Sequence, residues 1–180
     1  MILAVDVNYR GDEAVAAGVV FEKWSDKKSI REIVVSIPEM KEYIPGRFYQ
    51  RELPCIQALL KEIDTEIKCI IVDGYVYLGS DGAPGLGAHL FNALEGRVTV
   101  IGVAKKRFKD TPKSVELFRG KSKRPLYVTT QGIDMAVAKR YIAKMHGKNR
   151  IPTLLKRVDQ LCKKRNITPA CVLPVDRSAR

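Results

Sequence analysis

The chain has 180 residues, 46% of them hydrophobic, which is enough for one domain with a buried core but not for two full domains. It carries 32 Lys and Arg residues against 20 Asp and Glu residues, a formal net charge of +12. The basic runs gather between 105 and 165, and an excess of this size favours a polyanionic partner, so we expect DNA or RNA. No apolar run reaches the length of a membrane span, and we expect no membrane partner.

The four cysteines stand singly, without the CxxC pairs of zinc sites or the spacing of a disulfide framework. They are Cys55, Cys69, Cys162 and Cys171, and we interpret them as reduced thiols, at least the first two of them in apolar surroundings. The chain starts with MILAVDV, which has no basic leader and no small-residue cleavage site. We therefore expect a cytoplasmic protein, and we expect it to be a monomer.

Hydrophobic patterning predicts an α/β fold, with a single domain at 1–167 and a C-terminal tail at 168–180. Turn residues separate three strands at 2–9, 14–24 and 29–37, which is typical of an antiparallel meander. Beyond it, the pattern predicts strands at 68–74, 98–105 and 125–130 and helices at 53–62, 86–96, 133–147 and 152–165. Apolar runs such as CIIV and VTVIGV are typical of parallel strands covered on both faces. The prediction is a mixed sheet, with the meander followed by parallel strands, flanked by helices.

Acidic residues stand at informative places in this pattern. Asp6 lies inside the apolar strand LAVDV, where an ionised carboxylate is costly unless it is paired or bound to a cation. Asp73 ends the apolar strand IIVDG at its carboxyl edge, where open α/β sheets bind ligands. If the two strands are parallel neighbours, both carboxylates face one site and favour a divalent cation, Mg²⁺ or Mn²⁺. Glu52, at the start of a predicted helix, is the natural third ligand.

Each of these residues also has a simpler explanation. Asp73 is placed to cap a loop, and Glu52 is placed to interact with a helix N-terminus. Lys105 follows the strand VTVIGVA, so its ammonium could reach the same sheet edge as the acids and neutralise a phosphate. As part of the basic run KKRFK it could equally be a solvated lysine, and Lys106 fits that description better.

Short motifs follow one another between Asp6 and about Arg165 in an order that is specific as a set. They are AVDVNY, YIPG, FYQRELP, IVDG, LGAHL, IGVAKKR, PLYVTT and RIP. With these motifs the chain resembles the endonuclease V family, the deoxyinosine 3′ endonucleases, which have a ribonuclease H-like fold.

The resemblance implies roles for individual residues. It implies that the metal ligands are Asp6, Glu52 and Asp73. Together with Lys105, which its place after the strand brings to the same sheet edge, they are the expected catalytic residues. It further implies that YIPG is a wedge that enters a duplex at an altered base, and that a pocket for the everted hypoxanthine base is shaped in part by a glycine. The residues expected to contact nucleic acid are Tyr43, Ile44, Pro45, Gly46, Gly74 and Lys106.

The chain departs from the family pattern at two places. After VDG the family has a histidine-containing stretch, whereas this chain has YVYLGSDGAPG, without histidine. Gln131 falls at or near the position of another family histidine and cannot transfer protons. Asp134 begins the following helix and is either a fourth carboxylate, as ribonuclease H-like folds often place one there, or the N-cap of that helix.

We therefore expect a Mg²⁺-dependent endonuclease that cleaves a phosphodiester bond near a deaminated base, inosine, in DNA or RNA. The alternative is a catalytically impaired module that binds mismatched, branched or altered nucleic acid without cutting it. A nucleotide-binding domain built on the loop 79–87 is a third hypothesis, although that loop lacks the glycine spacing of a phosphate-binding motif.

Overall fold

The computed structural model describes residues 1–11, 13–38, 49–164 and 171–174. Its strands are β1 (Ile2–Arg10), β2 (Glu13–Phe21), β3 (Arg31–Ile37), β4 (Cys69–Val72), β5 (Tyr77–Leu78), β6 (Ala83–Pro84), β7 (Thr99–Ala104), β8 (Glu116–Leu117), β9 (Leu126–Gln131) and β10 (Cys171–Pro174). Its helices are α1 (Tyr49–Lys61), α2 (Leu86–Ala93), α3 (Met135–Lys144) and α4 (Thr153–Cys162), with one 3-10 turn at Lys113–Val115.

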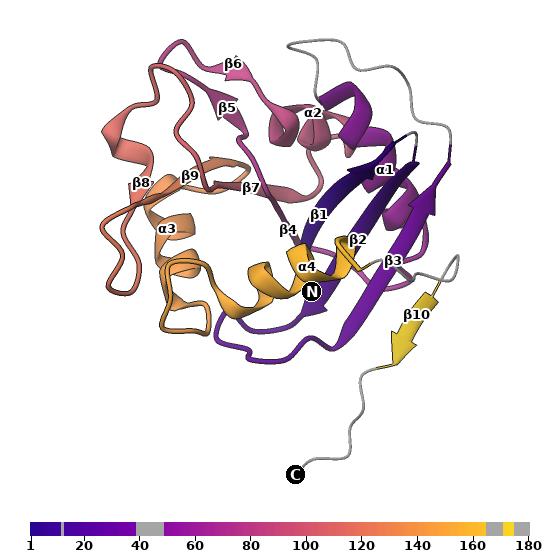
Figure 1. Ribbon diagram of the computed structural model, residues 1–180. Helices are drawn as coiled ribbons and strands as arrows, with labels where there is room; N and C mark the ends of the chain where they lie inside the picture. The colour runs from indigo at the N-terminus through magenta and orange to yellow at the C-terminus, as the bar shows by residue number, and fades with distance from the viewer. Residues whose placement is uncertain (12, 39–48, 165–170, 175–180) are drawn as a thin grey trace.

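Eight strands form one mixed sheet in the order β10-β3-β2-β1-β4-β7-β9-β8 (Figure 1). The predicted meander is confirmed, because β1, β2 and β3 pair antiparallel. β4 is parallel to β1 and also to β7, as the apolar runs predicted. The mixed sheet flanked by helices is therefore the predicted fold class, and β5 and β6 form a separate two-stranded ribbon.

Two strands differ from the simplest version of the prediction. β9 runs antiparallel to β7, because the segment between them holds only a 3-10 turn and β8 instead of the crossover that a parallel connection needs. The parallel part of the sheet is therefore limited to β1, β4 and β7. β10 lies within the predicted tail 168–180 and pairs antiparallel with β3, so four residues of that segment extend the sheet.

The sheet separates two hydrophobic layers. Alternate residues of β1 enter opposite layers, with Leu3 and Val5 packed on the side of α1 and α2, and Ile2 and Ala4 packed on the side of α3 and α4. α4 lies across β1 and β2 on the face nearer the viewer in Figure 1. None of the helices in the described ranges is long and apolar enough to cross a membrane.

An ion pair between a buried glutamate and a partly exposed arginine joins α4 to the sheet. Glu32 of β3 is 8% exposed, and its carboxylate accepts from Arg157 Nε at 2.8 Å and Arg157 Nη2 at 2.6 Å. Ser29 Oγ donates to the same carboxylate at 2.9 Å. Burial acts to raise the pKa of Glu32, but these hydrogen bonds outweigh it and hold the pKa below its usual value. The pair therefore orients α4 only while Glu32 is ionised.

We expect Arg157→Ala to lower the free energy of unfolding at pH 7 by about 2 kcal/mol, because it leaves the Glu32 carboxylate buried without its partner while Arg157 itself is partly hydrated. Since the folded-state pKa is the lower one, this stabilisation is present above the usual pKa of 4.5 and is lost as the pH falls below that value. Urea unfolding at several pH values measures both effects. Arg97→Ala, which removes an exposed ion pair with Glu95, is the control and should change little; equal losses in both variants would contradict the prediction.

Candidate active site

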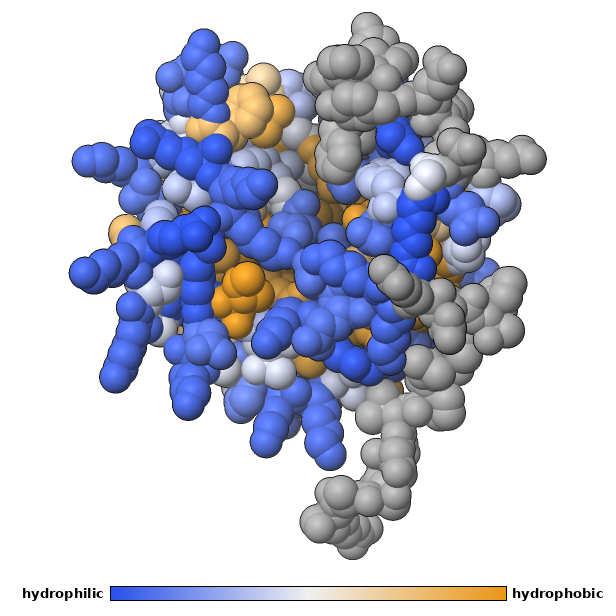
Figure 2. All heavy atoms as spheres, viewed as in Figure 1, coloured by the Kyte–Doolittle hydropathy of each residue, from blue (hydrophilic) through white to orange (hydrophobic). Residues whose placement is uncertain are grey.

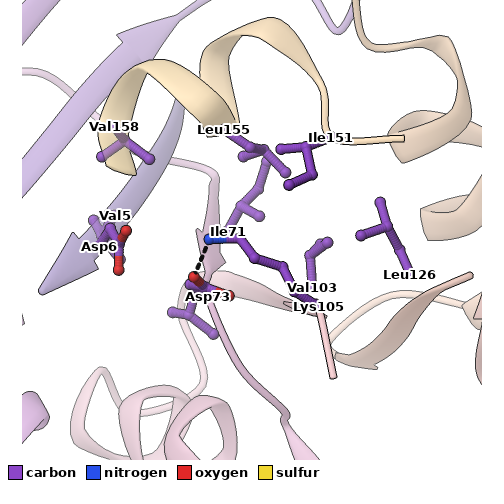
Figure 3. A pocket seen from close by; sticks show the side chains of 11 residues that line it. Val5, Asp6, Ile71, Asp73, Val103, Lys105, Leu126, Ile151, Leu155 and Val158 are labelled. Carbon is purple, nitrogen blue, oxygen red and sulfur yellow. Dashed lines mark hydrogen bonds and ion pairs between the residues drawn. The ribbon is translucent and has the colours of Figure 1, made fainter. Parts of the chain in front are cut away.

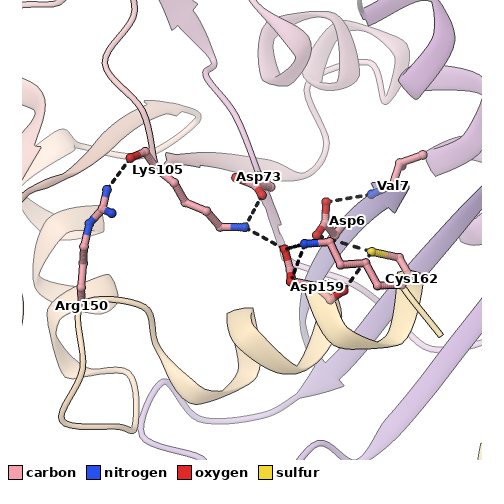
Figure 4. A network of polar contacts seen from close by, with 8 residues as sticks. Asp6, Val7, Asp73, Lys105, Arg150, Asp159 and Cys162 are labelled. Carbon is pink, nitrogen blue, oxygen red and sulfur yellow. Dashed lines mark hydrogen bonds and ion pairs between the residues drawn. The ribbon is translucent and has the colours of Figure 1, made fainter. Parts of the chain in front are cut away.

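Three carboxylates meet at the carboxyl edge of the parallel strands. Val5 pairs with Val72 in the ladder between β1 and β4, so Asp6 and Asp73 follow side by side. Asp159 comes from α4, which crosses this edge. One oxygen atom of each carboxylate lies within 4.8 Å of those of the other two. Figure 4 shows the three acids around one small space.

Two lysines hold these acids. Lys105, directly after β7, donates from Nζ to Asp73 Oδ2 at 2.5 Å and to Asp159 Oδ1 at 3.1 Å. Lys163 Nζ donates to both oxygens of Asp159 at 2.8 and 2.9 Å. Burial disfavours the Lys105 ammonium, yet its contacts with Asp73 and Asp159 are stronger and raise its pKa above the usual value. Lys105 is therefore a fixed cation of the site.

An apolar floor directs Lys105 toward the acids. Beneath the carboxylates lies a cavity of about 20 Å³, roughly the space of one water molecule, lined mainly by aliphatic side chains of the sheet and α4. Figure 3 shows the Lys105 chain running past Val103 to place its nitrogen at Asp73. The aliphatic lining lowers the local polarity on one side of the acids, which strengthens their electrostatic interactions.

Burial and mutual repulsion act on the acids. The pKa of Asp6 is raised to about 6, first by burial and then by the neighbouring Asp73 charge, despite the opposing effect of Lys105. The amide of Val7 and the thiol of Cys162 donate to Asp6 at 2.9 and 3.6 Å. Glu52 is 6% exposed, and burial followed by the charges of Asp6 and Asp73 raises its pKa well above the usual value. Concentrated negative charge of this kind is what a bound cation relieves.

The donor set fits a hard divalent cation. All three converging groups are carboxylates, the ligands that Mg²⁺ and Mn²⁺ prefer. Burial first, and then the Asp73 charge, raise the pKa of Asp6, whereas Lys163 and Lys105 overcome burial and lower the pKa of Asp159. A divalent cation would further favour the ionised form of Asp6. Glu52 is outside the group of three but lies close enough to feel the charges of Asp6 and Asp73.

A second, larger pocket adjoins the acids. It has a volume of about 290 Å³ and is lined by Tyr49, Glu52, Asp73, Gly74, Tyr75, Leu78, Pro84, Gly85, Leu86 and Phe108. Tyr49 stacks on His89 with ring centroids 3.5 Å apart and an interplanar angle of 11°. Gly74 has a φ of 157° and open space where a Cβ would be. The pocket is therefore lined by aromatic side chains and by two carboxyl groups, those of Glu52 and Asp73.

Tyr75 couples this pocket to Lys105. Its hydroxyl donates to the Lys106 carbonyl at 2.8 Å and accepts from the Phe108 amide at 3.1 Å. Gly102 of β7 allows this arrangement, because a Cβ there would lie 2.6 Å from the Gly74 carbonyl oxygen. The segments that carry Asp73 and Lys105 are thus held in contact by the Tyr75 hydroxyl and by close backbone packing at Gly102.

The structure brings together only some of the residues singled out in the sequence. Asp6, Asp73 and Lys105 meet at the sheet edge, Glu52 lies beside them, and Gly74 lines the adjoining pocket. The side chain of Lys106 is exposed. Tyr43, Ile44, Pro45 and Gly46 lie outside the described residues.

The structure decides between the two interpretations of Asp134 in favour of the helix N-cap, and it places Gln131, the last residue of β9, away from the acids. Asp134 does not join the acids, because its side chain caps α3 by accepting from the amides of Ala136 and Val137 at 2.9 and 3.1 Å. Gln131 pairs with Val100 near the start of β7, so it lies at the opposite edge of the sheet from the acids. Its replacement of a histidine therefore does not alter the carboxylate cluster.

Asp159 was missed in the sequence. It stands in LLKRVDQLC, whose apolar spacing predicts an amphipathic helix, and its neighbour Val158 is buried. An acid beside the buried stripe is a weak signal, since surface helices carry many acids. Only the packing of α4 across β1 brings Asp159 to Asp6.

Comparison with known proteins identifies the family. The model of the family Endonuclease V matches residues 1–140. Endonuclease V of Pyrococcus horikoshii is 33% identical over 168 residues, which are 91% of this chain and 74% of that protein. The chain belongs to the endonuclease V family. The resemblance inferred from the motifs is therefore confirmed, and the chain is a nuclease that acts on nucleic acid.

Solved endonuclease V structures share the architecture. The one from Streptomyces avermitilis has a TM-score of 0.70 at 27% identity and covers 90% of this chain and 79% of that chain. Human ENDOV has a TM-score of 0.73 at 20% identity, covering 90% and 82%, and supports the fold alone. The ribonuclease H-like fold expected from the motifs is confirmed.

We expect Tyr75→Phe to loosen the segment 106–108 without unfolding the domain. The substitution removes the hydroxyl that donates to the Lys106 carbonyl and accepts from the Phe108 amide. Losing this contact, worth about 1 kcal/mol, should speed hydrogen exchange at the Phe108 amide several-fold. Exchange measured by mass spectrometry or NMR reports the change. Tyr77→Phe, at a 37% exposed tyrosine, is the matched control; unchanged exchange in Tyr75→Phe would show that the hydroxyl does not hold the segment.

Proposed function

We propose that the chain is a Mg²⁺-dependent endonuclease that cleaves a phosphodiester bond near a deaminated base, inosine, in DNA or RNA, with Mn²⁺ as a substitute cation. The observation that carries the proposal is the convergence of Asp6, Asp73 and Asp159 beside Lys105 and next to an aromatic pocket.

The acids hold the cation in this proposal. Asp6, Asp73 and Asp159 would bind it, and Glu52 offers a further carboxyl from α1. A divalent cation in this position supplies Lewis acidity and an activated water for phosphodiester hydrolysis. Lys105 has a separate task, since its ammonium lies at the same edge and offers a positive charge to the scissile phosphate.

The adjoining pocket receives the altered base. Tyr49, Tyr75 and Phe108 provide aromatic surfaces on which a flat base can stack, and Gly74 leaves room where a side chain would intrude. Because Asp73 lines this pocket and also belongs to the acid cluster, a base bound there would place the adjoining backbone at the acids. The motif YIPG at 43–46 would act as the wedge that keeps the base out of the stack.

We place this activity in the cytoplasm and in a monomer. Within the described residues, the buried thiols Cys69 and Cys162 form no disulfide, which supports a reducing compartment.

We expect end-labelled inosine-containing DNA or RNA to be cut in Mg²⁺ or Mn²⁺ and to remain intact in chelator. Asp6→Ala and Asp73→Ala should each lower the single-turnover rate by at least about 100-fold, because each removes a ligand of the cation. Glu62→Gln, at an exposed acid remote from the sheet edge, is the control. Binding of inosine-containing strands without cleavage in any cation would instead support the impaired binding module.

A second comparison separates the two candidates for a fourth carboxylate. We expect Asp159→Asn to lower the cleavage rate by about 100-fold with little loss of stability. Asp134→Ala should do the reverse, lowering the free energy of unfolding by about 1 kcal/mol through loss of the α3 cap while cleavage persists. Single-turnover rates and urea unfolding of both variants measure these effects, and loss of cleavage in Asp134→Ala alone would contradict the assignment of Asp159.

A further inference from the structure

Two basic hollows lie beyond the site on the side of α3 and α4. The first, of about 370 Å³, is lined by Lys121, Ser122, Lys148, Asn149 and Arg150. The second, of about 460 Å³, shares Asn149 and is lined by Lys27, Lys28 and Lys156 among others. We call Lys27, Lys28, Lys121, Lys148, Arg150 and Lys156 the distal basic surface. Figure 2 shows hydrophilic side chains crowding this part of the molecule.

The distal basic surface starts at the site. Arg150 donates from Nη2 to the Pro125 carbonyl at 2.8 Å and to the Lys105 carbonyl. Figure 4 shows Arg150 reaching the backbone of Lys105 from the segment before α4. Arg150 therefore connects the first hollow to Lys105, whose ammonium faces the acids. Because the two hollows share Asn149, the cations form a path that leads away from Lys105.

The path is held rigidly. Arg119 is 7% exposed and donates to the carbonyls of Ile142, Gly147 and Asn149 at 3.1, 3.0 and 2.7 Å. Gly120, with a φ of 62°, packs so closely that a Cβ would lie 2.3 Å from the Lys148 carbonyl oxygen. The two loops that carry Lys121 and Lys148 are thus locked together. Cations on a fixed frame lose less entropy when they bind a ligand than cations on free loops.

No salt bridge offsets the charge of the path among the residues that the structure describes. Lys105, Lys163 and Arg157 form salt bridges with carboxylates. Within the described ranges, by contrast, no residue of the distal basic surface forms one. Glu32 is the carboxylate of the second hollow, and Arg157 already holds it. Burial and the nearby charge of Arg124 both lower the pKa of Arg150, so like charges are kept together there.

We propose that the distal basic surface binds the sugar-phosphate backbone of one arm of the nucleic acid substrate, on a single side of the cleaved bond. The inference rests on the proposed function, which puts the scissile phosphate at Lys105. Phosphates spaced regularly along a strand match a path of separated cations better than a single anion does. The contacts are to the backbone, so they add affinity without adding sequence preference.

The test compares substrates with one long arm. Fluorescence anisotropy in chelator measures binding of two oligonucleotides that carry one inosine and extend either only 5′ or only 3′ of it, and of a short one without arms. We expect Lys121→Ala/Lys148→Ala to weaken binding about tenfold for one of the long substrates alone. The slope of log K against log salt should fall by about 1 to 2 for that substrate, since each lost phosphate contact removes about 0.9 from a duplex slope.

Lys61→Ala/Lys68→Ala is the matched control, because it removes the same charge from exposed lysines away from the hollows. Lys27→Ala/Lys28→Ala tests the second hollow on a different element and guards against a fold defect in the first variant. Equal weakening in the control, equal weakening for all three substrates, or no weakening in either variant would overturn the proposal. A second assay measures pelleting of the protein with vesicles of anionic lipid. If both variants lose this pelleting but keep oligonucleotide binding, the proposal is also overturned.

The measurement also separates this inference from the proposed function. Binding is read without divalent cation and without cleavage. If the variants lose affinity for one long-armed substrate alone and the protein never cleaves, the inference about the distal basic surface stands and the proposed nuclease function is rejected. Inosine-dependent cutting with unchanged binding by the variants would reject the surface and keep the nuclease.

Discussion

The central constraint on the site is that Asp6, Asp73 and Asp159 are held within 4.8 Å of one another in a partly buried place. Like charges at this separation repel, and the raised pKa of Asp6 records the strain together with the effect of burial. Three elements supply the force that opposes the repulsion. The ladder of β1 and β4 fixes two acids, α4 fixes the third, and Lys105 bridges them. The site is thus paid for by the packing of the sheet and α4.

α4 connects stability with chemistry. Its buried face packs on the sheet, its Arg157 is bound to Glu32, and its Asp159 completes the carboxylate group. A substitution of Glu32 would therefore move Asp159 by changing the orientation of α4. No hydrogen bond between the two described residues is needed for this effect. The same helix contributes Lys156 to the distal basic surface. One rigid element thereby fixes the distance between the acids and the cations outside the site.

The sequence predicted the centre of the site better than its surroundings. Asp6 and Asp73 were recognisable because an acid interrupts or ends an apolar strand, and strand periodicity then fixes where it points. Asp159 was not recognisable, because an acid on an amphipathic helix acquires a role only when tertiary packing sets the rotation of that helix. The antiparallel direction of β9 and the addition of β10 also depend on chain reversals and edge pairing that local patterns do not encode. The order of the short motifs, in contrast, correctly predicted the protein family.

The basic side chains behind the net charge of +12 fall into two groups with different physical roles. Lys105 and Lys163 are paired with acids, so they contribute geometry and local charge balance but little long-range attraction. Cations such as Lys121 and Lys148 are unpaired within the described residues and remain available to a polyanion at distance. These unpaired cations therefore attract a phosphodiester before it reaches the carboxylates, which by themselves would repel it. The arrangement lets a site built from negative groups act on a negative substrate, with the compensation placed beside the acids for chemistry and beyond them for affinity.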